Sequence, residues 1–192
     1  DSYYLDNISY FMCWTFISLG LAVIWGMGGI LSFGQTAFFG LAGYGFSVIS
    51  INFLGIAGVS IWSVVLSLII TGIFGMIVGY FLFYGGIYDV FIGIVTLAIT
   101  LVLETFMQQT AGPEYAIGSA RLNGFNGMQG MPTIGFESIQ FGLLEGITQY
   151  YFILLLAIII LISLYKFKQS KIGLVFLASK EDRERVSSLG HN

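Results

Sequence analysis

The chain has 192 residues, of which 57% are hydrophobic and only 9% are charged, with a formal net charge of −3. Soluble domains carry about 25% charged residues, so these charges are too few to coat a water-soluble globule of this size. The composition predicts a polytopic, all-α integral membrane protein in the lipid bilayer, and the acidic balance argues against a nucleic-acid partner.

Five apolar segments are predicted to cross the membrane as helices. One span requires about 20 apolar residues, and no charged residue lies between Asp6 and Asp89. The runs are continuous, whereas the strands of a β-barrel would alternate in segments of about ten residues. The predicted spans cover residues 9–26, 30–51, 57–83, 90–110 and 150–165. The second span is rich in glycine, so a re-entrant segment is an alternative to a full crossing there.

Small and polar residues recur along the second predicted span. Gaps of three and four residues place most of them on one side of a helix. The set consists of Ser32, Gln35, Thr36, Gly40, Gly43, Ser47 and Ser50. Such spacing is typical of close helix packing in membranes, which is the simpler interpretation. Packing explains Gln35 least well, so Gln35 and Thr36 are also candidates for lining a substrate pathway.

A polar stripe runs along the fourth predicted span. Thr96, Thr100, Glu104 and Gln108 recur every four residues and therefore share one face of a helix. A carboxylate inside a span usually faces the bundle interior or a water-filled cavity, because exposure to lipid is costly. The stripe is a candidate lining for a substrate pathway. In the alternative interpretation, the threonine hydroxyls bond to carbonyls of their own helix and Glu104 pairs with a neighbouring side chain.

The basic residues predict the orientation in the membrane. Six of the seven Lys and Arg residues lie at or beyond the end of the last predicted span: Lys166, Lys168, Lys171, Lys180, Arg183 and Arg185. Because such residues accumulate on the cytoplasmic side, we expect the tail after residue 165 to be cytoplasmic. Counting back over five spans then places the N-terminus and the long polar loop, residues 111–149, on the outer side.

The tail segment at residues 168–188 contains a charge cluster. Residues 180–185 read Lys-Glu-Asp-Arg-Glu-Arg and follow an apolar stretch at residues 172–178. This segment is either a solvated basic anchor that fixes the topology or a short amphipathic helix that docks on a partner. The pattern alone leaves both interpretations open.

Enzymatic and metal-binding motifs do not occur in the sequence. It contains no His-Glu-x-x-His, no Gly-x-Ser-x-Gly and no Cys/His cluster with metal-ligand spacing. The glycine-rich run at residues 26–29 lacks the Lys-Ser/Thr ending of a phosphate-binding loop. We therefore expect no catalytic site, metal or cofactor in this chain, and any ATP that drives it would be bound by another subunit.

The stretch from Trp25 to Tyr44 is more specific than the composition. Residues 25–40 read WGMGGILSFGQTAFFG and are followed by Gly43-Tyr44. This pattern resembles the signature of permease subunits in branched-chain amino acid ABC importers, and related importers for urea and short amides share it. Further motifs of that family are similar, in the same order, to residues 94–98, 123–127, 130–132, 171–173, 178, 180–182 and 189–192.

The resemblance implies the permease subunit of an ATP-driven importer in a bacterial inner membrane. Residues 1–192 would form one transmembrane permease domain, a fragment without the family's remaining helices. The implied partners are cytoplasmic ATP-binding subunits, a second permease subunit and an extracytoplasmic substrate-binding protein, which would dock on the outer surface that includes residues 111–149. Branched-chain or other hydrophobic amino acids are the first expectation for the substrate, and urea or short amides are the alternative.

The resemblance also implies that residues 168–188 couple the permease to its ATPase. The matching positions are Gly173, Ala178, Lys180, Glu181 and Asp182. The chain departs from the family at Leu174 and Leu177, where basic residues are usual. A passive channel or an ion-coupled transporter that uses Glu104 would need no coupling segment, and it is the alternative from a different functional class.

Overall fold

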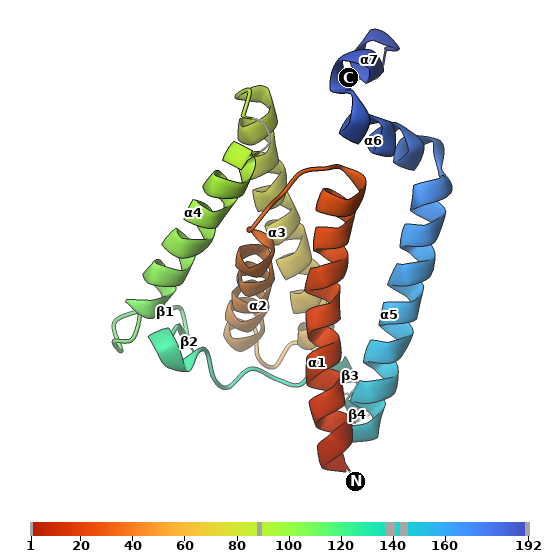
Figure 1. Ribbon diagram of the computed structural model, residues 1–192. Coiled ribbons are helices and arrows are strands. Elements are labelled where there is room, and N and C mark those ends of the chain that lie inside the picture. Colours follow the sequence, from red (N-terminus) through yellow and green to blue (C-terminus); the bar gives the residue numbers. More distant parts are fainter. Residues whose placement is uncertain (1, 88–89, 137–140, 143–145, 191–192) are drawn as a thin grey trace.

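The computed structural model describes residues 2–87, 90–136, 141–142 and 146–190 (Figure 1). Parts of the predicted outer loop and the last two residues of the motif at 189–192 lie outside the described residues. Within the described part of the chain, four helices are long and apolar enough to cross a membrane. They are α1 (Ser2–Leu21), which continues into the π-helical turn η1 (Ala22–Met27), α3 (Val59–Tyr84), α4 (Val90–Gln108) and α5 (Gly146–Gln169). The prediction of an all-α, polytopic membrane protein is confirmed.

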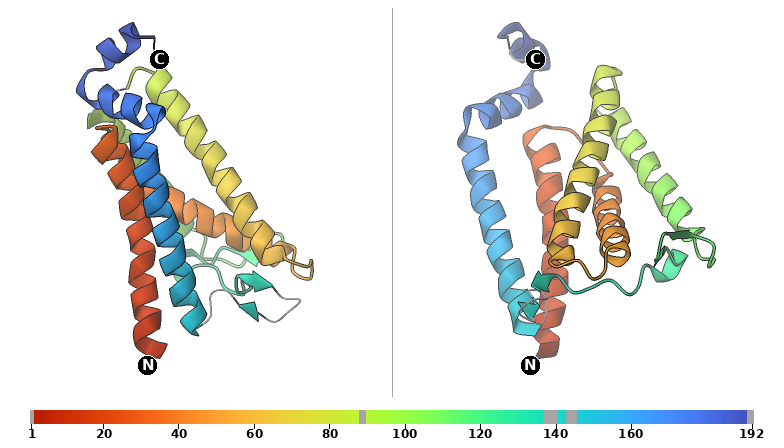
Figure 2. Two further views of the ribbon diagram at one scale, coloured as in Figure 1. Left: turned by 90° about the vertical axis from the view of Figure 1, so that its right-hand side faces the viewer. Right: turned by 180° about the vertical axis from the view of Figure 1, so that it is seen from behind.

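The second predicted span is interrupted. After η1 the chain turns at Gly28 and Gly29 and continues without regular structure to Gly34, and α2 (Gln35–Asn52) begins at the next residue. The expectation of one continuous helix over residues 30–51 is therefore wrong for its first five residues. Figures 1 and 2 show that this part of the chain leads from the end of α1 to the opposite end of the bundle, where α3 starts. The segment thus crosses the bundle instead of returning to the side from which it came.

Glycine explains why the first helix stops where it does. Gly29 has a φ of +69°, a left-handed conformation that glycine adopts at no steric cost and other residues adopt rarely. Apolar residues such as Leu31 and Phe33 could continue a helix, but the turn that precedes them redirects the chain.

Helix α2 packs against α3 through small side chains. A Cβ atom at Gly45 would lie 3.2 Å from the Cβ of Ser67, so the two backbones approach closely, as is common for helices in membranes. Ser47 and Ser50 on α2 are buried. The small residues of the second span therefore serve helix packing over much of its length.

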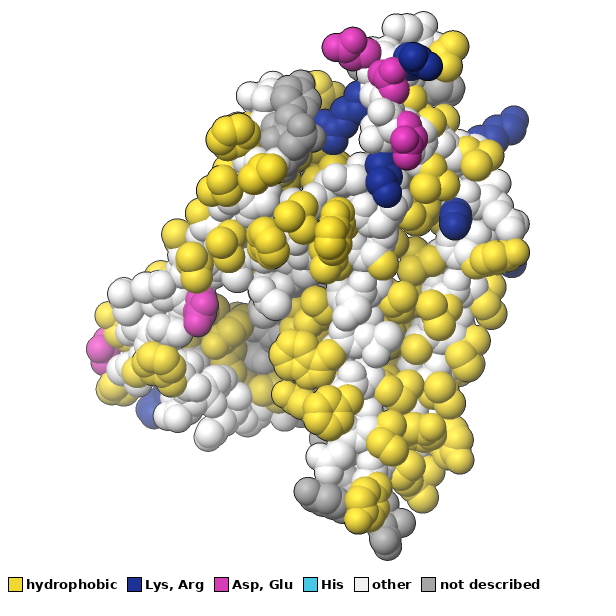
Figure 3. Space-filling model, viewed as in Figure 1, with side chains coloured by type: hydrophobic (Ala, Val, Ile, Leu, Met, Phe, Trp, Pro, Cys, Tyr) yellow, Lys and Arg dark blue, Asp and Glu magenta, His cyan; other side chains and the backbone are white. Residues whose placement is uncertain are grey.

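The membrane-spanning helices and α2 form two groups, α2 with α3 and α4, and α1 with α5. Helix α1 packs along α5, and α4 lies on the other side of α2 (Figure 1). The flanks of this bundle are apolar: Figure 3 shows hydrophobic side chains spread over α1, α4 and α5. Large side chains such as Leu68 and Met76 on α3 are more than half exposed, as expected for helices whose surroundings are lipid rather than water.

The long loop and the charged tail lie at opposite ends of the bundle (Figures 1 and 2). The loop contains the short strand pairs β1 (Ala116–Ile117) with β2 (Ala120–Arg121) and β3 (Gly135–Phe136) with β4 (Phe141–Gly142), and the 3-10 turn η2 (Gly124–Asn126). The tail forms α6 (Lys171–Glu181) and α7 (Arg183–Ser188). Loop and tail therefore lie at different ends of the bundle, and their placement on different sides of the membrane stays a prediction.

Candidate functional site

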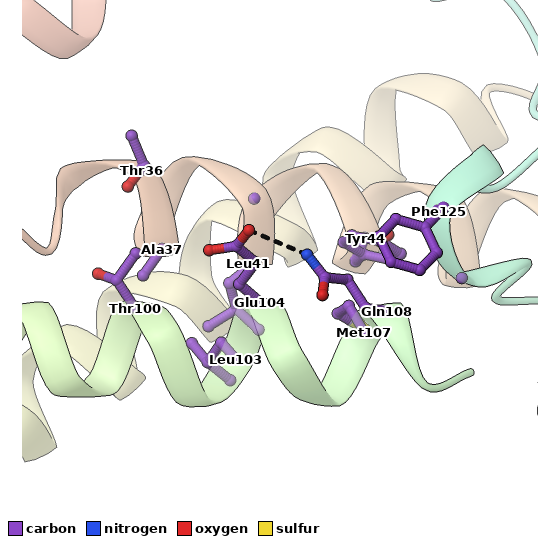
Figure 4. A pocket seen from close by; sticks show the side chains of 12 residues that line it. Thr36, Ala37, Leu41, Tyr44, Thr100, Leu103, Glu104, Met107, Gln108 and Phe125 are labelled. Atoms are coloured by element: carbon purple, nitrogen blue, oxygen red, sulfur yellow. Dashed lines mark hydrogen bonds between the residues drawn. The ribbon is translucent and has the colours of Figure 1, made fainter. Parts of the chain in front are cut away.

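A cavity of about 380 Å³ lies between α2 and α4 and is bounded at one end by η2 (Figure 4). Its lining comes from Thr36, Ala37, Gly40, Leu41 and Tyr44 of α2, from Thr100, Leu103, Glu104, Met107 and Gln108 of α4, and from Gly124 and Phe125 of η2. Spacings of three and four residues bring each of these sets onto one helical face. Four residues predicted for the pathway line the cavity: Thr36, Thr100, Glu104 and Gln108.

Glu104 and Gln108 form the polar side of the cavity. The Gln108 Nε2 atom donates a hydrogen bond to Glu104 Oε1 at 3.0 Å, and both side chains point from α4 towards α2 (Figure 4). Glu104 therefore pairs with a neighbouring side chain and also faces a cavity, and its place on a substrate pathway stays a prediction. No Lys or Arg is among the lining residues that the structure describes, so the carboxylate is the one formal charge of the lining.

The two threonines of the stripe bind the extended segment, residues 28–34, and Thr100 also lines the cavity. Thr96 is buried; its Oγ1 accepts a hydrogen bond from the Phe33 N–H at 3.0 Å and donates to the Ile92 carbonyl at 2.8 Å. Thr100 Oγ1 lies 3.0 Å from the Phe33 carbonyl and 2.9 Å from the Thr96 carbonyl. The interrupted backbone at Phe33 thus finds on α4 the partners that a regular helix would have supplied.

Gln35, the first residue of α2, does not line the cavity. Its Nε2 atom is buried and has no hydrogen-bond partner among the described residues. Of the six predicted pathway residues, Gln35 and Thr96 therefore lie outside the cavity lining. Gln35 is the first residue of α2, and Thr96 binds the extended segment at Phe33.

Asn52 was not predicted from the sequence, although it holds the long loop, residues 111–149, at the end of α2. Its Nδ2 atom donates to the Ile117 carbonyl at 2.7 Å, and its Oδ1 accepts from the Ser119 N–H at 2.8 Å. A Cβ atom at Gly118 would overlap the Asn52 amide, so the turn between β1 and β2 fits tightly against the end of α2. A single asparagine at the end of an apolar run carries no periodic signal that could have revealed this contact.

Two further contacts fix the loop. Ala120, Leu122 and Met128 form a buried apolar cluster that packs on the side chains of α2. At the start of α3, Ser60 Oγ donates to the Gly135 carbonyl at 2.9 Å. Together with Asn52, these contacts hold the loop, including η2, against α2 and α3.

The predicted coupling residues lie at the other end of the molecule. Gly173 is buried in the first turn of α6, where its N–H donates to Ser170 Oγ at 3.1 Å, and Ala178 and Glu181 are exposed. Lys180 Nζ donates to the Gly26 carbonyl at 3.2 Å. Asp182 caps α7, accepting from the Arg185 N–H at 3.0 Å and pairing with Arg185 Nε at 2.9 Å.

The two predicted sites are therefore separate: a cavity between α2 and α4, and a charged pair of short helices at the far end. Across the residues that the structure describes, no three metal-ligating side chains gather at one place. The cavity can hold a small molecule through one carboxylate, several hydroxyl and amide groups and an apolar wall. None of these groups forms a pairing of nucleophile and base that would suggest covalent chemistry.

Comparison with known proteins identifies a family. The family model described as the permease component of a branched-chain amino acid transport system matches residues 3–192. No match was found among curated proteins or among solved structures.

Proposed function

Because this chain belongs to the family of permease components of branched-chain amino acid transport systems, we propose that it is the membrane-spanning subunit of an ATP-driven importer in a bacterial inner membrane. Its substrates would be branched-chain or other hydrophobic amino acids, and the cavity between α2 and α4 would lie on their path. The observation that carries this proposal is the cavity itself, to which α2 and α4 both contribute polar and apolar side chains.

The chemistry of the cavity suits an amino acid with an aliphatic side chain. The Glu104 carboxylate can accept hydrogen bonds from an ammonium group, and the Thr36 hydroxyl can donate to a carboxylate. Leu41 and Met107 offer an apolar wall. A volume of about 380 Å³ lies within the range of about 300–1,000 Å³ that is usual for small-molecule pockets.

The two ends of the molecule suit different partners. The outer loop, residues 111–149, would contribute to the dock for an extracytoplasmic substrate-binding protein, and residues 168–188 would contact cytoplasmic ATP-binding subunits. A second permease subunit would complete the translocation path. ATP would be bound and hydrolysed by the partner, and this chain would alternate between outward-open and inward-open states by largely rigid-body movement.

Uptake measurements test the proposal most simply. A strain that lacks the full-length gene is compared with its parent for ATP-dependent uptake of labelled leucine and labelled urea. We expect leucine uptake to be lost and to return when the gene is supplied on a plasmid. Loss of urea uptake alone would move the substrate to the amide importers, and unchanged uptake of both compounds in a strain without redundant importers would contradict the proposal.

Glu104→Gln separates an importer from a channel or an ion-coupled transporter. In the importer the variant loses the charge that would attract an ammonium group; a hydrogen bond to a charged group contributes about 1.5–3 kcal/mol, so the KM for leucine should rise about tenfold or more. Uptake should still require ATP. Glu114→Gln, which alters an exposed carboxylate of the outer loop, is the matched control. If Glu104 selects ions or relays protons, Glu104→Gln will instead abolish a pH-dependent flux that needs no ATP.

A further inference from the structure

Helix α6 contacts the turn that begins the extended segment. Lys180 donates a hydrogen bond to the carbonyl of Gly26, the penultimate residue of η1. Helices α6 and η1 are in contact. Figure 1 shows α6 beside the end of the bundle where η1 finishes. The tail therefore contacts the bundle at this turn as well as through its covalent connection to α5.

Two glycines allow α6 to approach the turn this closely. A Cβ atom at Gly28 would lie 2.5 Å from Phe176 Cζ and 2.8 Å from the Ile24 carbonyl oxygen, and a Cβ atom at Gly29 would lie 2.7 Å from Lys180 Cγ. A larger residue at position 28 would have to displace the Phe176 ring and the backbone of the turn, and one at position 29 would displace the Lys180 side chain and strain the backbone at φ +69°. Close-packed contacts of this kind transmit displacement, because protein interiors are hardly compressible.

The other end of the same segment is bound to α4. The N–H of Phe33 donates to Thr96 Oγ1, and Thr100 Oγ1 donates to the carbonyl of Phe33. One turn before Thr96 on α4, a Cβ atom at Gly93 would lie 3.5 Å from the Leu31 carbonyl oxygen. Thr100 also lines the cavity, so the segment runs without a gap from α6 to the cavity wall.

We propose that the extended segment, residues 28–34, is a direct mechanical link between α6 and the cavity, in which Gly28, Gly29 and Thr96 act as positioning residues. This inference rests on the proposed function, because it takes α6 to be the contact for the ATP-binding subunits. When those subunits move α6, Phe176 and Lys180 displace the turn, and Phe33 carries the displacement to α4. The covalent route through α5 reaches the same turn only by way of α1, which packs along α5 and continues into η1, so the contact of α6 with the turn is the shorter route.

The test uses the complete importer, with its ATP-binding subunits, second permease and binding protein, in lipid vesicles. Uptake of labelled leucine and hydrolysis of ATP are measured on the same preparation. Gly28→Ala is compared with Gly20→Ala, since a Cβ atom at Gly20 has nothing within 4 Å. We expect Gly28→Ala to lower the leucine taken up per ATP by about fivefold or more, the low end of the range for coupled sites, and Gly20→Ala to leave that ratio unchanged.

A second pair of variants keeps the test decisive if Gly28→Ala impairs assembly. Thr96→Val removes the hydroxyl that accepts from Phe33, whereas Thr96→Ser keeps it, and Thr96 is not part of the cavity lining. We expect the same loss of coupling in Thr96→Val and recovery in Thr96→Ser. In a Phe176→Ala background, Gly28→Ala should lower the leucine taken up per ATP by a smaller factor, because the ring that the new methyl group would meet is absent.

The outcomes separate the link from the function. If the wild-type complex takes up neither leucine nor urea with ATP, the proposed function fails and the link fails with it. If the wild type transports leucine, and Gly28→Ala and Thr96→Val both match their controls in leucine per ATP, the importer stands and the mechanical link is wrong.

Discussion

At the scale of single residues, a few polar side chains fix the position of long stretches of backbone. Asn52 forms hydrogen bonds with the turn at residues 117–119. Thr96 and Thr100 of α4 form hydrogen bonds with the backbone of Phe33. Each of these side chains supplies hydrogen-bond partners to backbone groups that lie outside the helices. The placement of the outer loop and of the interrupted crossing therefore depends on individual hydrogen bonds.

We predict that Asn52→Ala loosens the outer loop. The variant loses two hydrogen bonds to the loop, each contributing about 1 kcal/mol, so the β1–β2 turn should detach while the apolar cluster under β2 and η2 remains. Hydrogen–deuterium exchange measures this directly, and the amide of Ser119 should exchange faster. Ser119→Ala is the matched control, because its backbone N–H is unchanged. Equal exchange rates in Asn52→Ala and the wild type would show that Asn52 does not hold the turn.

At the scale of elements, the sequence predicted four helices well and the second crossing only in part. Long apolar runs bounded by polar loops identify helices with little ambiguity, because only a helix satisfies its own backbone in lipid. Residues 30–34 are as apolar as their neighbours, so composition could not distinguish a helix from an extended chain there. The difference arises from Gly29 and from the threonines of α4, which are contacts distant in sequence.

The candidate site was predicted to a similar degree. The spacing of four residues placed Thr100, Glu104 and Gln108 on one face of α4, and those residues do line the cavity. The same spacing included Thr96, whose burial beneath Phe33 depends on a segment 63 residues away. Asn52 could not be predicted because its partners lie 65 and 67 residues further along the chain.

We predict that Asp182→Ala frays α7. Asp182 is the N-cap of that helix and pairs with Arg185, and loss of such a cap costs about 0.5–2 kcal/mol. Amide exchange of residues 183–188 should rise, whereas Asp182→Asn, which keeps an oxygen acceptor at the cap, should remain close to the wild type. If exchange in Asp182→Ala does not change, packing rather than the cap holds α7.

At the scale of the whole molecule, the length of the bundle separates the long loop from the charged tail. The loop over the cavity and the helices α6 and α7 occupy opposite ends of a bundle with apolar flanks, and the charged side chains on the face in Figure 3 gather mainly around α6 and α7. In a bundle of this kind, the two surfaces that water-soluble partners could contact lie at opposite ends, and the cavity lies between them. In the proposed importer, the substrate-binding protein and the ATP-binding subunits would contact these two ends.

Cysteine labelling tests the orientation. Ser119 and Ser187 are both exposed, one in the loop and one in α7, and the chain's own Cys13 can first be changed to serine. In spheroplasts a membrane-impermeant maleimide should label the Ser119→Cys variant at once and the Ser187→Cys variant only after permeabilisation. Labelling in the reverse order would show that the loop is cytoplasmic and the tail is outside, which contradicts the predicted orientation.

The most direct test of the cavity as a substrate path uses two glycines of α2. A Cβ atom at Gly40 and one at Gly43 both have nothing within 4 Å, but only Gly40 lines the cavity. ATP-dependent uptake of labelled leucine is measured for Gly40→Leu and Gly43→Leu in cells that make equal amounts of each variant. We predict that Gly40→Leu abolishes uptake and that Gly43→Leu retains it. Equal uptake by the two variants would contradict a substrate path between α2 and α4.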